Sequence, residues 1–271
     1  MNISKYRLLA LDLDGTLTNS QKQVSEKNRK YIRLAQDKGV DIILASGRPV
    51  IGIESVAKAL NLYETGGYIL AYNGGQIIDC KSNKALIEHF VPSQYYHEIC
   101  DIIHRFHVFP LTYNQTGVIC ENDEDKYVHQ ECYNNSVPLH KVESLEAELN
   151  GPIVKFMVVG EPEELNKAAI YFRECFKGAL NVFFSEPYFM EITPPGIEKS
   201  SALAALLKLL NIPREELMAC GDGLNDIPML EYAGFSVAMA NAYDETKKYA
   251  DFISASNEDD GVALAIEKFI L

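Results

Sequence analysis

The feature that most constrains the fold is the alternation of short apolar runs with helical patterns in the first part of the chain. Apolar runs lie at residues 7–11, 40–45 and 68–72, and helical patterns separate them at 27–38 and from 49 to about 60. Strands that alternate with helices at this spacing form βαβ units, whose strands lie parallel in one sheet. The pattern therefore predicts an α/β fold built on a parallel sheet.

The last third of the chain repeats this alternation, whereas the middle differs in texture. The expected elements of the last third are a strongly amphipathic helix at 200–210, strands at 217–220 and 235–240, and a helix at 261–269. Those of the middle are helices at 92–106 and 163–177, and strands at 87–91, 117–121, 153–159 and 182–185. We therefore expect residues 1–81 and 188–271 to form one domain, into which an α/β domain of residues 82–187 is inserted.

The composition argues against several classes of partner. A formal net charge of −13 over 271 residues is unfavourable for nucleic-acid binding, which needs clustered Lys and Arg. No apolar run approaches the roughly 20 residues that span a bilayer, and the N-terminal segment lacks a signal-peptide pattern. The six cysteines form no CxxC pair or zinc-type spacing, which favours reduced thiols. We therefore expect a cytoplasmic protein without a nucleic-acid or membrane partner, and we leave its oligomeric state open.

Two carboxylates follow the first predicted strand, in the loop Asp12-Leu13-Asp14-Gly15-Thr16. Ligands bind at the carboxyl ends of strands in open parallel sheets, so this loop is a candidate site. One carboxylate can attack a substrate while the other serves the leaving group. Gly15 lets the backbone bend, so that N–H groups of the loop can hold phosphoryl oxygens. An Asp-Gly turn is the alternative, but unpaired carboxylates are costly at the end of a buried strand.

Two further polar positions accompany predicted elements of the sheet domain. Ser46-Gly47-Arg48 follows the second strand, where a hydroxyl and a backbone N–H suit a phosphoryl oxygen. A plain Ser-Gly turn before a proline is the more common explanation. Lys199 lies at the start of the helix at 200–210, where a lysine is usually a solvated charge that the helix dipole disfavours. A bound anion or carboxylate would reverse that preference.

The last polar segment is typical of a hard-cation site. Asp222, Asn225 and Asp226 lie within five residues after the predicted strand at 217–220. Mg²⁺ prefers one or two carboxylates and keeps several waters, which neighbouring side chains can orient. A turn that caps the next helix is the alternative, and it suits Asp226 better than Asp222.

The positions of the histidines limit the chemistry of the sheet domain. All six fall in the predicted insert: His89, His97, His104, His107, His129 and His140. A histidine acid, base or phosphoryl acceptor is therefore not expected, and the sequence has no GxxxxGK[ST] phosphate loop. His104 and His107 could share a helix face as metal ligands, but no third ligand accompanies them, so we expect solvated or packed histidines. Carboxylates and Lys199 are left to carry the chemistry.

Taken together, these segments resemble the haloacid dehalogenase superfamily of phosphohydrolases, and the insert resembles the α/β cap of its Cof-type branch (class IIB). The resemblance covers nearly the whole chain. It rests on Asp12-x-Asp14-Gly15-Thr16, Ser46-Gly47-Arg48, Asn73-Gly74-Gly75, Lys199, Gly221-Asp222-x-x-Asn225-Asp226 and the run 257–263. It implies a Rossmann-like parallel sheet core with an inserted cap. Ser200 stands where the branch usually has Gly, which implies a local difference in the loop.

The resemblance also implies a Mg²⁺-dependent hydrolysis of a small phosphorylated metabolite through an aspartyl phosphate on Asp12. Asp14 would protonate the leaving oxygen and then activate water, and we expect Asp12 and partial burial to raise its pKa. Mg²⁺ would be held by Asp12, the backbone carbonyl of Asp14 and Asp222, with Asp226 in the outer shell. Phosphate or substrate contacts would fall to Gly15, Thr16, Ser46, Gly47, Arg48, Asn73, Gly74, Lys199 and Asn225.

Two other functions compete with hydrolysis. A sugar phosphomutase of the same superfamily would need arginines to grip a second phosphate, and the insert has only Arg105 and Arg173. A catalytically silent sensor or partner-binding protein is disfavoured by the intact set of acidic residues and Lys199. Sugar phosphates are the expected substrate class by resemblance alone. The insert is expected to set specificity, and Lys155 is either a substrate contact or a solvent-facing strand residue.

Overall fold

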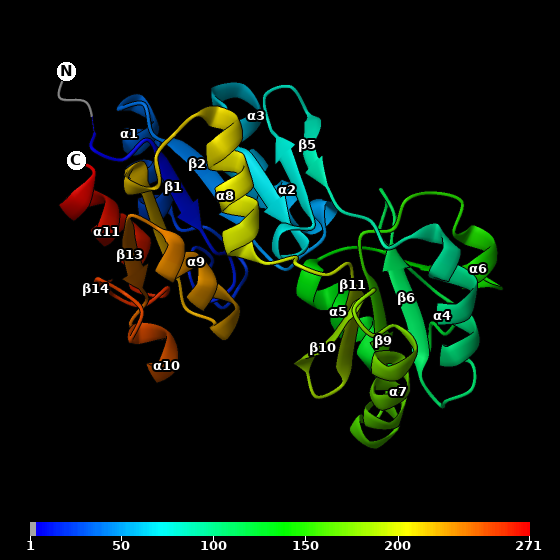
Figure 1. Ribbon diagram of the computed structural model, residues 1–271. Helices are drawn as coiled ribbons and strands as arrows, with labels where there is room; N and C mark the ends of the chain where they lie inside the picture. Colours follow the sequence, from blue (N-terminus) through cyan, green and yellow to red (C-terminus); the bar gives the residue numbers. More distant parts are fainter. Residues whose placement is uncertain (1–3) are drawn as a thin grey trace. The chain divides into compact units, whose positions relative to one another are not determined.

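The structure is a computed structural model that describes residues 4–271. It divides into two compact units, each with a sheet and a hydrophobic core (Figure 1). The core unit comprises the described residues up to Ile87 together with Glu198–Leu271, and the inserted unit comprises Glu88–Ile197. No helix within residues 4–271 is long and apolar enough to cross a membrane.

The core unit is built on an eight-stranded sheet. In spatial order its strands are β14 (Phe252–Ile253), β13 (Phe235–Ala238), β12 (Leu217–Gly221), β1 (Leu8–Leu11), β2 (Asp41–Ala45), β3 (Tyr68–Ala71), β4 (Gln76–Asp79) and β5 (Lys84–Glu88). Neighbouring strands from β14 to β3 pair in parallel, and β4 pairs antiparallel with β3. This sheet matches the parallel sheet that the alternating pattern predicts.

Helices cover both faces of the core sheet. One face packs against α1 (Glu26–Asp37), α2 (Val50–Ala59) and α11 (Gly261–Phe269), and the other against α8 (Lys199–Leu210) and α9 (Ile227–Tyr232). Successive side chains of a strand point to opposite faces. In β1, Leu9 and Leu11 accordingly join the first cluster, and Leu8 and Ala10 join the second. Burial on both faces explains why the central strands are continuous apolar runs.

Short segments complete the core unit. They are α3 (Leu62–Thr65), α10 (Asp244–Lys247) and the 3₁₀ turns η1 (Tyr72–Gly74), η3 (Arg214–Glu216) and η4 (Leu224–Asp226). The start of α1 shows how local sequence sets an element boundary. The Ser25 hydroxyl accepts a hydrogen bond from the N–H of Asn28, which caps the helix, and Gly39 turns the chain after it with a φ of +83°.

The inserted unit has a six-stranded sheet in which β7 and β8 pair in parallel and the other neighbours pair antiparallel. Its order is β10 (Asn181–Glu186), β11 (Phe189–Thr193), β9 (Phe156–Val159), β6 (Phe109–Tyr113), β7 (Val118–Cys120) and β8 (Leu139–Lys141). Its helical segments are η2 (Ser93–Tyr95), α4 (Tyr96–Ile103), α5 (Lys126–Asn135), α6 (Leu145–Glu148) and α7 (Pro162–Cys175). Apolar side chains of α4 and α7 pack with alternate residues of the central strands, such as Phe156, Val158, Met190 and Ile192.

The expected boundaries of the insert, residues 82–187, need correction. The strand predicted at 87–91 lies earlier, as β5, and it belongs to the edge of the core sheet. The second boundary lies ten residues later than expected, because β11 pairs with β9 and β10 of the inserted sheet. The helix predicted at 92–106 is shorter, since a 3₁₀ turn occupies its start and α4 ends at Ile103.

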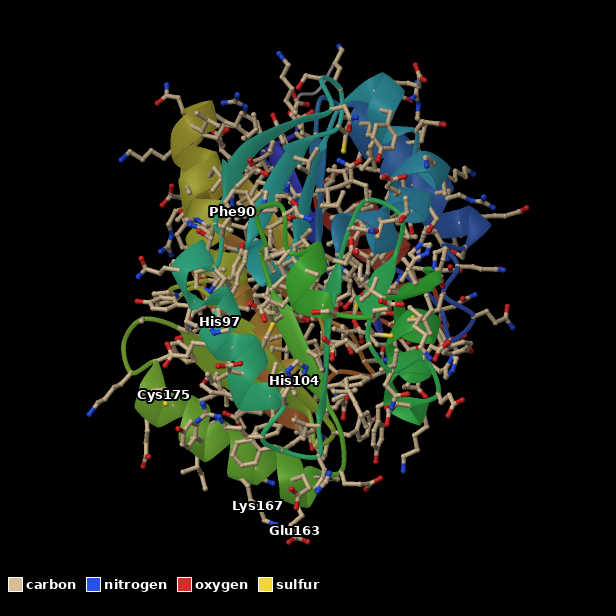
Figure 2. The ribbon with its side chains drawn as sticks, turned by 90° about the vertical axis from the view of Figure 1, so that its right-hand side faces the viewer. Phe90, His97, His104, Glu163, Lys167 and Cys175 are labelled. Carbon is tan, nitrogen blue, oxygen red and sulfur yellow. The ribbon has the colours of Figure 1, made fainter. Side chains whose placement is uncertain are left out.

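Two histidines of the inserted unit contact carboxylates at its surface. His97 lies on α4 and His104 follows its last residue, and both side chains are exposed (Figure 2). The Nδ1 atom of His97 is 2.7 Å from Oε1 of Glu146, and Nε2 of His104 is 2.8 Å from Oε2 of Glu121. Over residues 4–271, no His-containing group has the geometry of a metal site. The exposed side chains of His97 and His104 agree with the expectation of solvated histidines at these two positions.

Lys155 does not face solvent, which was one of the two expectations for it. Its side chain is 4% exposed, and its Nζ atom lies 3.2 Å from Oε2 of Glu191. Lys155 is therefore a buried partner of a carboxylate and not a solvent-facing strand residue.

Candidate active site

The polar loops singled out in the sequence meet at one edge of the core sheet. Leu11, the last residue of β1, is in register with Cys220 of β12 and Leu44 of β2. The segments that follow these parallel strands start at Asp12, Asp222 and Ser46, so they emerge side by side at the carboxyl ends. The 3₁₀ turn η1 follows β3 at the same edge and carries Asn73.

The centre of the site is a buried arrangement of Lys199 between two aspartates. The Nζ atom of Lys199 lies 2.6 Å from Oδ1 of Asp12 and 2.6 Å from Oδ1 of Asp226. The Lys199 side chain has no exposed surface, and that of Asp226 is 1% exposed. Helix α8 begins at Lys199, so this helix start delivers the ammonium to the end of β1. The cost of a lysine at a helix N-terminus is offset by the two carboxylates.

Asp226 organises the loop that carries Asp222. Its Oδ2 atom accepts hydrogen bonds of 2.9 Å from the N–H groups of both Asp222 and Gly223. A Cβ atom on Gly221 would lie 2.6 Å from Cβ of Asp226, so the strand end can approach this aspartate only as glycine. Both carboxylate oxygens of Asp226 thus have protein partners, which makes it the structural support of the loop.

Asp222 is held against the loop after β1. Its Oδ1 atom accepts a 2.8 Å hydrogen bond from the hydroxyl of Thr16. Gly15 has a φ of +80°, and a Cβ atom there would come within 2.3 Å of Oδ2 of Asp222. The Asp-Gly-Thr sequence therefore has a geometric reason: glycine leaves room for the second acidic loop, and threonine orients it.

Asp12, Asp222 and Asp226 form a cluster in which one oxygen of each lies within 4.8 Å of the others. Burial and the neighbouring carboxylates raise the pKa of Asp12 well above its usual range, against the lowering effect of Lys199. Burial likewise raises the pKa of Asp222 to about 6, although the Thr16 hydrogen bond lowers it. One ammonium thus faces three carboxylates, and the surplus negative charge is what a divalent cation would offset.

Asp14 does not behave as the sequence led us to expect. Burial raises its pKa, but hydrogen bonds and charge from Arg48 and Lys22 outweigh burial, so the pKa of Asp14 is lowered. The guanidinium of Arg48 donates from Nε to Oδ2 at 2.7 Å and from Nη2 to Oδ1 at 2.5 Å, and Lys22 Nζ donates to Oδ1 at 2.5 Å. The expectation of a raised pKa was wrong because Asp14 is paired with two cations.

The remaining candidate residues line the same edge. The N–H of Arg48 donates to the hydroxyl oxygen of Ser46 at 3.2 Å, and the amide of Asn225 donates to Oδ1 of Asn73 at 3.2 Å. Two glycines allow close packing here. A Cβ atom on Gly47 would lie 3.1 Å from the side-chain amide of Asn73, and one on Gly74 would lie 2.7 Å from Cβ of Ala202 in α8. The structure thus brings the sequence-predicted set together, with contacts between segments far apart in the chain.

Two residues that support the site were missed from the sequence. Lys22, which lies in a polar stretch, reads as an ordinary surface charge until its contact with Asp14 is seen. Asn241 donates from its side-chain amide to the carbonyl of Gly15 at 2.7 Å and accepts from the N–H of Asn257 at 3.0 Å. An asparagine that follows a strand of the parallel sheet was the one available signal for Asn241.

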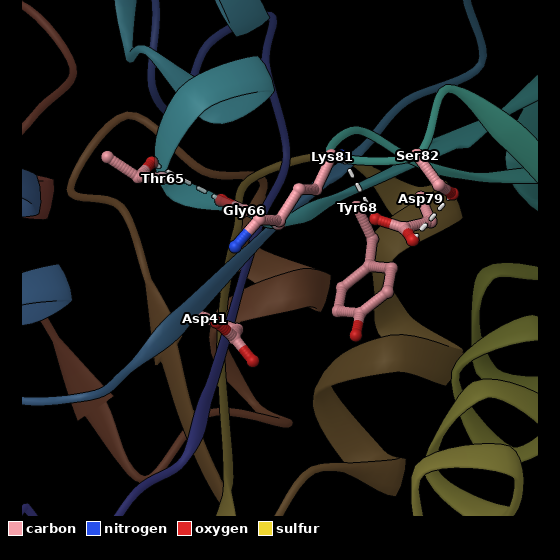
Figure 3. A pocket seen from close by; sticks show the side chains of 8 residues that line it. Asp41, Thr65, Gly66, Tyr68, Asp79, Lys81 and Ser82 are labelled. Carbon is pink, nitrogen blue, oxygen red and sulfur yellow. Dashed lines mark hydrogen bonds between the residues drawn. The ribbon is translucent and has the colours of Figure 1, made fainter.

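A separate hollow of about 440 Å³ lies at the other end of the strands (Figure 3). Asp41 begins β2, Tyr68 begins β3, and Asp79 ends the antiparallel β4, so the hollow is at the amino ends of the parallel strands. Oδ2 of Asp79 accepts from the Ser82 hydroxyl at 2.7 Å, and its Oδ1 accepts from the N–H of Lys81 at 3.0 Å. These contacts form a local turn, and none of the residues singled out in the sequence lines the hollow.

Comparison with known proteins agrees with the motif-based resemblance. The family described as haloacid dehalogenase-like hydrolase matches residues 9–266. A haloacid dehalogenase-like hydrolase from Bacteroides thetaiotaomicron, known from a crystal structure, is 40% identical, with a TM-score of 0.94 and coverage of 97% of this chain and 99% of that one. The structure of TM0651 from Thermotoga maritima is 28% identical, with a TM-score of 0.87 and coverage of 98% of both chains.

A functionally named relative comes from Bacillus subtilis (strain 168). It is the 5-amino-6-(5-phospho-D-ribitylamino)uracil phosphatase YcsE, which is 32% identical over 270 residues, covering 98% of this chain and 96% of the relative. The family match spans both units of the structure, so the expected family is confirmed. The chain belongs to the haloacid dehalogenase-like hydrolase family.

Proposed function

We propose that this phosphatase-type hydrolase requires Mg²⁺ and cleaves a small phosphorylated metabolite through a covalent phosphate on Asp12. The observation that carries the proposal is the cluster of Asp12, Asp222 and Asp226 at the carboxyl edge of the parallel sheet, in which Asp12 and Asp226 are buried and both contact Lys199. Such a cluster is costly to bury, and a structural role alone does not require three carboxylates for one ammonium. Binding of a divalent cation and an anionic substrate would explain why three carboxylates are clustered here.

The donor set fits Mg²⁺. Asp12 and Asp222 offer carboxylate oxygens close to one another, and hard oxygen ligands are those that Mg²⁺ prefers. The backbone carbonyl of Asp14, in the same loop as Asp12, is the third proposed ligand. Asp226 is committed to Lys199 and to two backbone N–H groups, which suits a supporting role in the outer shell. Bound there, Mg²⁺ would offset the repulsion between the phosphate and the carboxylates.

Asp12 is the proposed nucleophile because it is the member of the acidic cluster that directly follows β1 and keeps one carboxylate oxygen away from Lys199. Lys199 contacts Oδ1 of Asp12, and no hydrogen bond to Oδ2 is seen within the described residues. Attack by a carboxylate oxygen on phosphorus forms the aspartyl phosphate and expels the leaving alkoxide, which must gain a proton. Water then attacks the same phosphorus, which releases inorganic phosphate and regenerates Asp12. Ser46 and Asn225 are proposed to hold phosphoryl oxygens, as is Lys199.

Asp14 is the proposed source of that proton, and it must first leave its present partners. Arg48 and Lys22 occupy both of its oxygens and favour the ionised form. To donate a proton, Asp14 has to take one up and turn toward the leaving oxygen, and Arg48 would then be free to contact the substrate. The same carboxylate can later accept a proton from the hydrolytic water.

The proposed substrates are sugar phosphates and related polyol phosphates. The relative named for a phospho-ribitylamino compound favours a polyol chain as one leaving group. The inserted unit is the proposed specificity domain. The mutase alternative is disfavoured because both arginines singled out there have protein partners: Arg105 donates to the Tyr171 hydroxyl at 3.1 Å, and Arg173 to the Val182 carbonyl at 3.0 Å.

A substrate panel tests this function. Purified protein should hydrolyse p-nitrophenyl phosphate with Mg²⁺ and stop when EDTA removes the metal. We expect a screen of sugar phosphates, polyol phosphates and 5-amino-6-(5-phospho-D-ribitylamino)uracil, ranked by kcat/KM, to single out a polyol or sugar leaving group. Transfer of phosphate between two positions of one sugar, without release of inorganic phosphate, would instead identify a mutase.

A further inference from the structure

The turn η1, which follows β3 at the active-site edge, has three consecutive residues with a positive φ. Tyr72, Asn73 and Gly74 have φ values of +53°, +56° and +108°. Glycine and asparagine enter this region readily, whereas it is uncommon for a bulky residue such as tyrosine. Such a backbone persists only where the surrounding structure determines it, and it is often found at functional sites. We therefore asked what holds this turn and what it positions.

The turn is held from two sides by segments that carry proposed active-site residues. On one side, the N–H of Asn73 donates to the carbonyl of Ser46 at 2.9 Å. On the other side, a Cβ atom on Gly74 would lie 2.8 Å from the carbonyl oxygen of Glu198, which is the residue before Lys199. Only glycine lets the turn approach the start of α8 this closely. The backbone of Asn73 is thus fixed relative to both segments.

The Asn73 side chain contacts the loop that carries Asp222. Its Oδ1 atom accepts a hydrogen bond from Nδ2 of Asn225 at 3.2 Å. The Oδ1 atom of Asn225 lies against its own loop, since a Cβ atom on Gly223 would come within 2.5 Å of it. These two neighbours fix the plane of the Asn225 amide. An amide nitrogen carries two hydrogens, so one remains to donate to a phosphoryl oxygen.

We propose that Asn73 is a positioning residue that acts through Asn225, whose amide it orients toward a phosphoryl oxygen of the substrate. The inference rests on the proposed function, because it needs Asn225 to hold the phosphoryl group. The two residues lie 152 positions apart, so their contact is not a local property of either loop. The Asn225 side chain is exposed, and without its acceptor it would have to be ordered each time phosphate binds, which weakens binding.

A double-mutant cycle separates this role from a direct contact with the substrate. Asn73→Gly keeps a residue that accepts a positive φ and removes the amide, and Asn225→Ala removes the group on which Asn73 would act. For the wild type, both single variants and the double variant, isothermal titration calorimetry with Mg²⁺ gives the affinity for inorganic phosphate. Values of kcat/KM for p-nitrophenyl phosphate are measured on the same proteins.

Asn211 supplies the matched control. It is an exposed asparagine with a φ of +53° at the other end of α8, so Asn211→Gly makes the same change of residue and backbone freedom away from the site. This variant should change neither the affinity for phosphate nor kcat/KM. The affinity for Mg²⁺ without phosphate is measured as well, because a general loosening of the site would lower it.

We expect Asn225→Ala to weaken phosphate binding about tenfold and Asn73→Gly about fivefold, because a hydrogen bond to a charged group is stronger than one between neutral groups. In the Asn225→Ala background, Asn73→Gly should change the affinity by less than about twofold, since the group that it orients is gone. The changes in kcat/KM should run in parallel. The affinity of Asn73→Gly for Mg²⁺ should equal that of the wild type, because neither asparagine is a proposed metal ligand.

Three results would overturn the proposal. A loss that is as large in the Asn225→Ala background as in the wild type would make Asn73 a direct substrate contact. A loss of Mg²⁺ affinity in Asn73→Gly would mean that the turn only supports the site. An unchanged phosphate affinity in Asn73→Gly would show that Asn225 needs no orientation. If Asn225→Ala itself binds phosphate as the wild type does, the proposed role of Asn225 fails, and that of Asn73 fails with it.

Discussion

Lys199 and Asp12 form a buried ion pair, with Nζ of Lys199 2.6 Å from Oδ1 of Asp12, and the same ammonium serves Asp226 at an equal distance. Removing the cation leaves carboxylates buried without compensation. Lys199→Met should therefore lower the free energy of unfolding of the metal-free protein by about 3 to 5 kcal/mol. Urea unfolding measures this, and Mg²⁺ should restore part of the loss because it brings positive charge to the cluster.

Lys208 supplies the control for that experiment, because it is an exposed lysine in the last turn of the same helix. Lys208→Met should cost less than about 1 kcal/mol. If Lys199→Met is no more destabilising than this control, the buried pair does not have the electrostatic role assigned to it.

The affinity for Mg²⁺ should depend on pH through Asp222. Its pKa is raised to about 6 in the metal-free protein, so this carboxylate is ionised above that pH and protonated below it. Because the metal needs the ionised form, protonation of Asp222 should make the affinity fall by up to about tenfold per pH unit below about pH 6. Isothermal titration calorimetry between pH 5 and 8 measures the dependence.

Replacing Thr16 tests the role of the Asp222 pKa in a second way. Its hydrogen bond to Asp222 lowers the pKa of that carboxyl, so Thr16→Val should move the midpoint of the affinity change to higher pH. A Mg²⁺ affinity that stays constant from pH 5 to 8 in both proteins would exclude Asp222 as a ligand.

Lys155 should be a structural residue of the inserted unit. It is buried against Glu191, and Glu131 is a second buried carboxylate whose pKa is lowered by Lys155 although burial raises it overall. Lys155→Met should cost about 3 kcal/mol of stability, and the double variant Lys155→Met/Glu191→Gln should recover part of this. Lys126→Met, which breaks an exposed pair with Glu161, should cost under about 1 kcal/mol. An unchanged stability with a raised KM for sugar phosphates would instead make Lys155 a substrate contact.

The parallel strands of the core unit could be predicted because each one is marked by the apolar pattern of its own residues. β1 and most of β2 are apolar runs buried on both faces, and a polar residue, Asp12 or Ser46, directly follows each strand. Parallel pairing brings those ends to one edge, so the candidate site follows once the strands are recognised. The predicted set therefore meets in space although some of its members, such as Thr16 and Asp222, lie 206 residues apart.

Three strands of the inserted unit, β6, β8 and β11, were not predicted, and for two of them the reason can be identified. Pro110 interrupts the pattern of β6, since proline cannot donate to a ladder and is rare inside sheets. Glu191 interrupts the pattern of β11, and only its pairing with Lys155 explains a buried charge there. The second boundary of the insert was predicted too early because β11 was not recognised as one of its strands.

The charge state of Asp14 could not be predicted because it depends on side-chain pairing with Lys22 and Arg48, which lie 8 and 34 residues further along the chain. Arg48 reaches Asp14 from the loop after β2, and Lys22 reaches it from a turn whose anchors lie near residue 257. Local sequence reports only a second aspartate beside the first, which predicts a raised pKa. The pKa of Asp14 depends on where the side chains of Arg48 and Lys22 point, which the spacing of residues in the sequence does not show.

The replacement Asp12→Asn should abolish turnover and leave the fold intact. The amide neither attacks phosphorus nor carries the charge that Mg²⁺ needs, so activity on p-nitrophenyl phosphate should fall by at least about 10⁴-fold. Circular dichroism and the unfolding midpoint check the fold. Removing one buried carboxylate from a cluster with excess negative charge should keep the metal-free protein at least as stable as the wild type.

The most direct test of the account is to trap the phosphorylated protein. In Asp14→Asn, p-nitrophenyl phosphate should still phosphorylate the enzyme, while activation of the hydrolytic water is lost. We predict a burst of p-nitrophenolate close to one equivalent per chain with Mg²⁺. Acid quenching should then yield a hydroxylamine-labile phosphate that mass spectrometry places on Asp12, absent from Asp12→Asn/Asp14→Asn. Turnover without a burst or any labelled Asp12, or a label that survives in the double variant, would contradict the covalent mechanism.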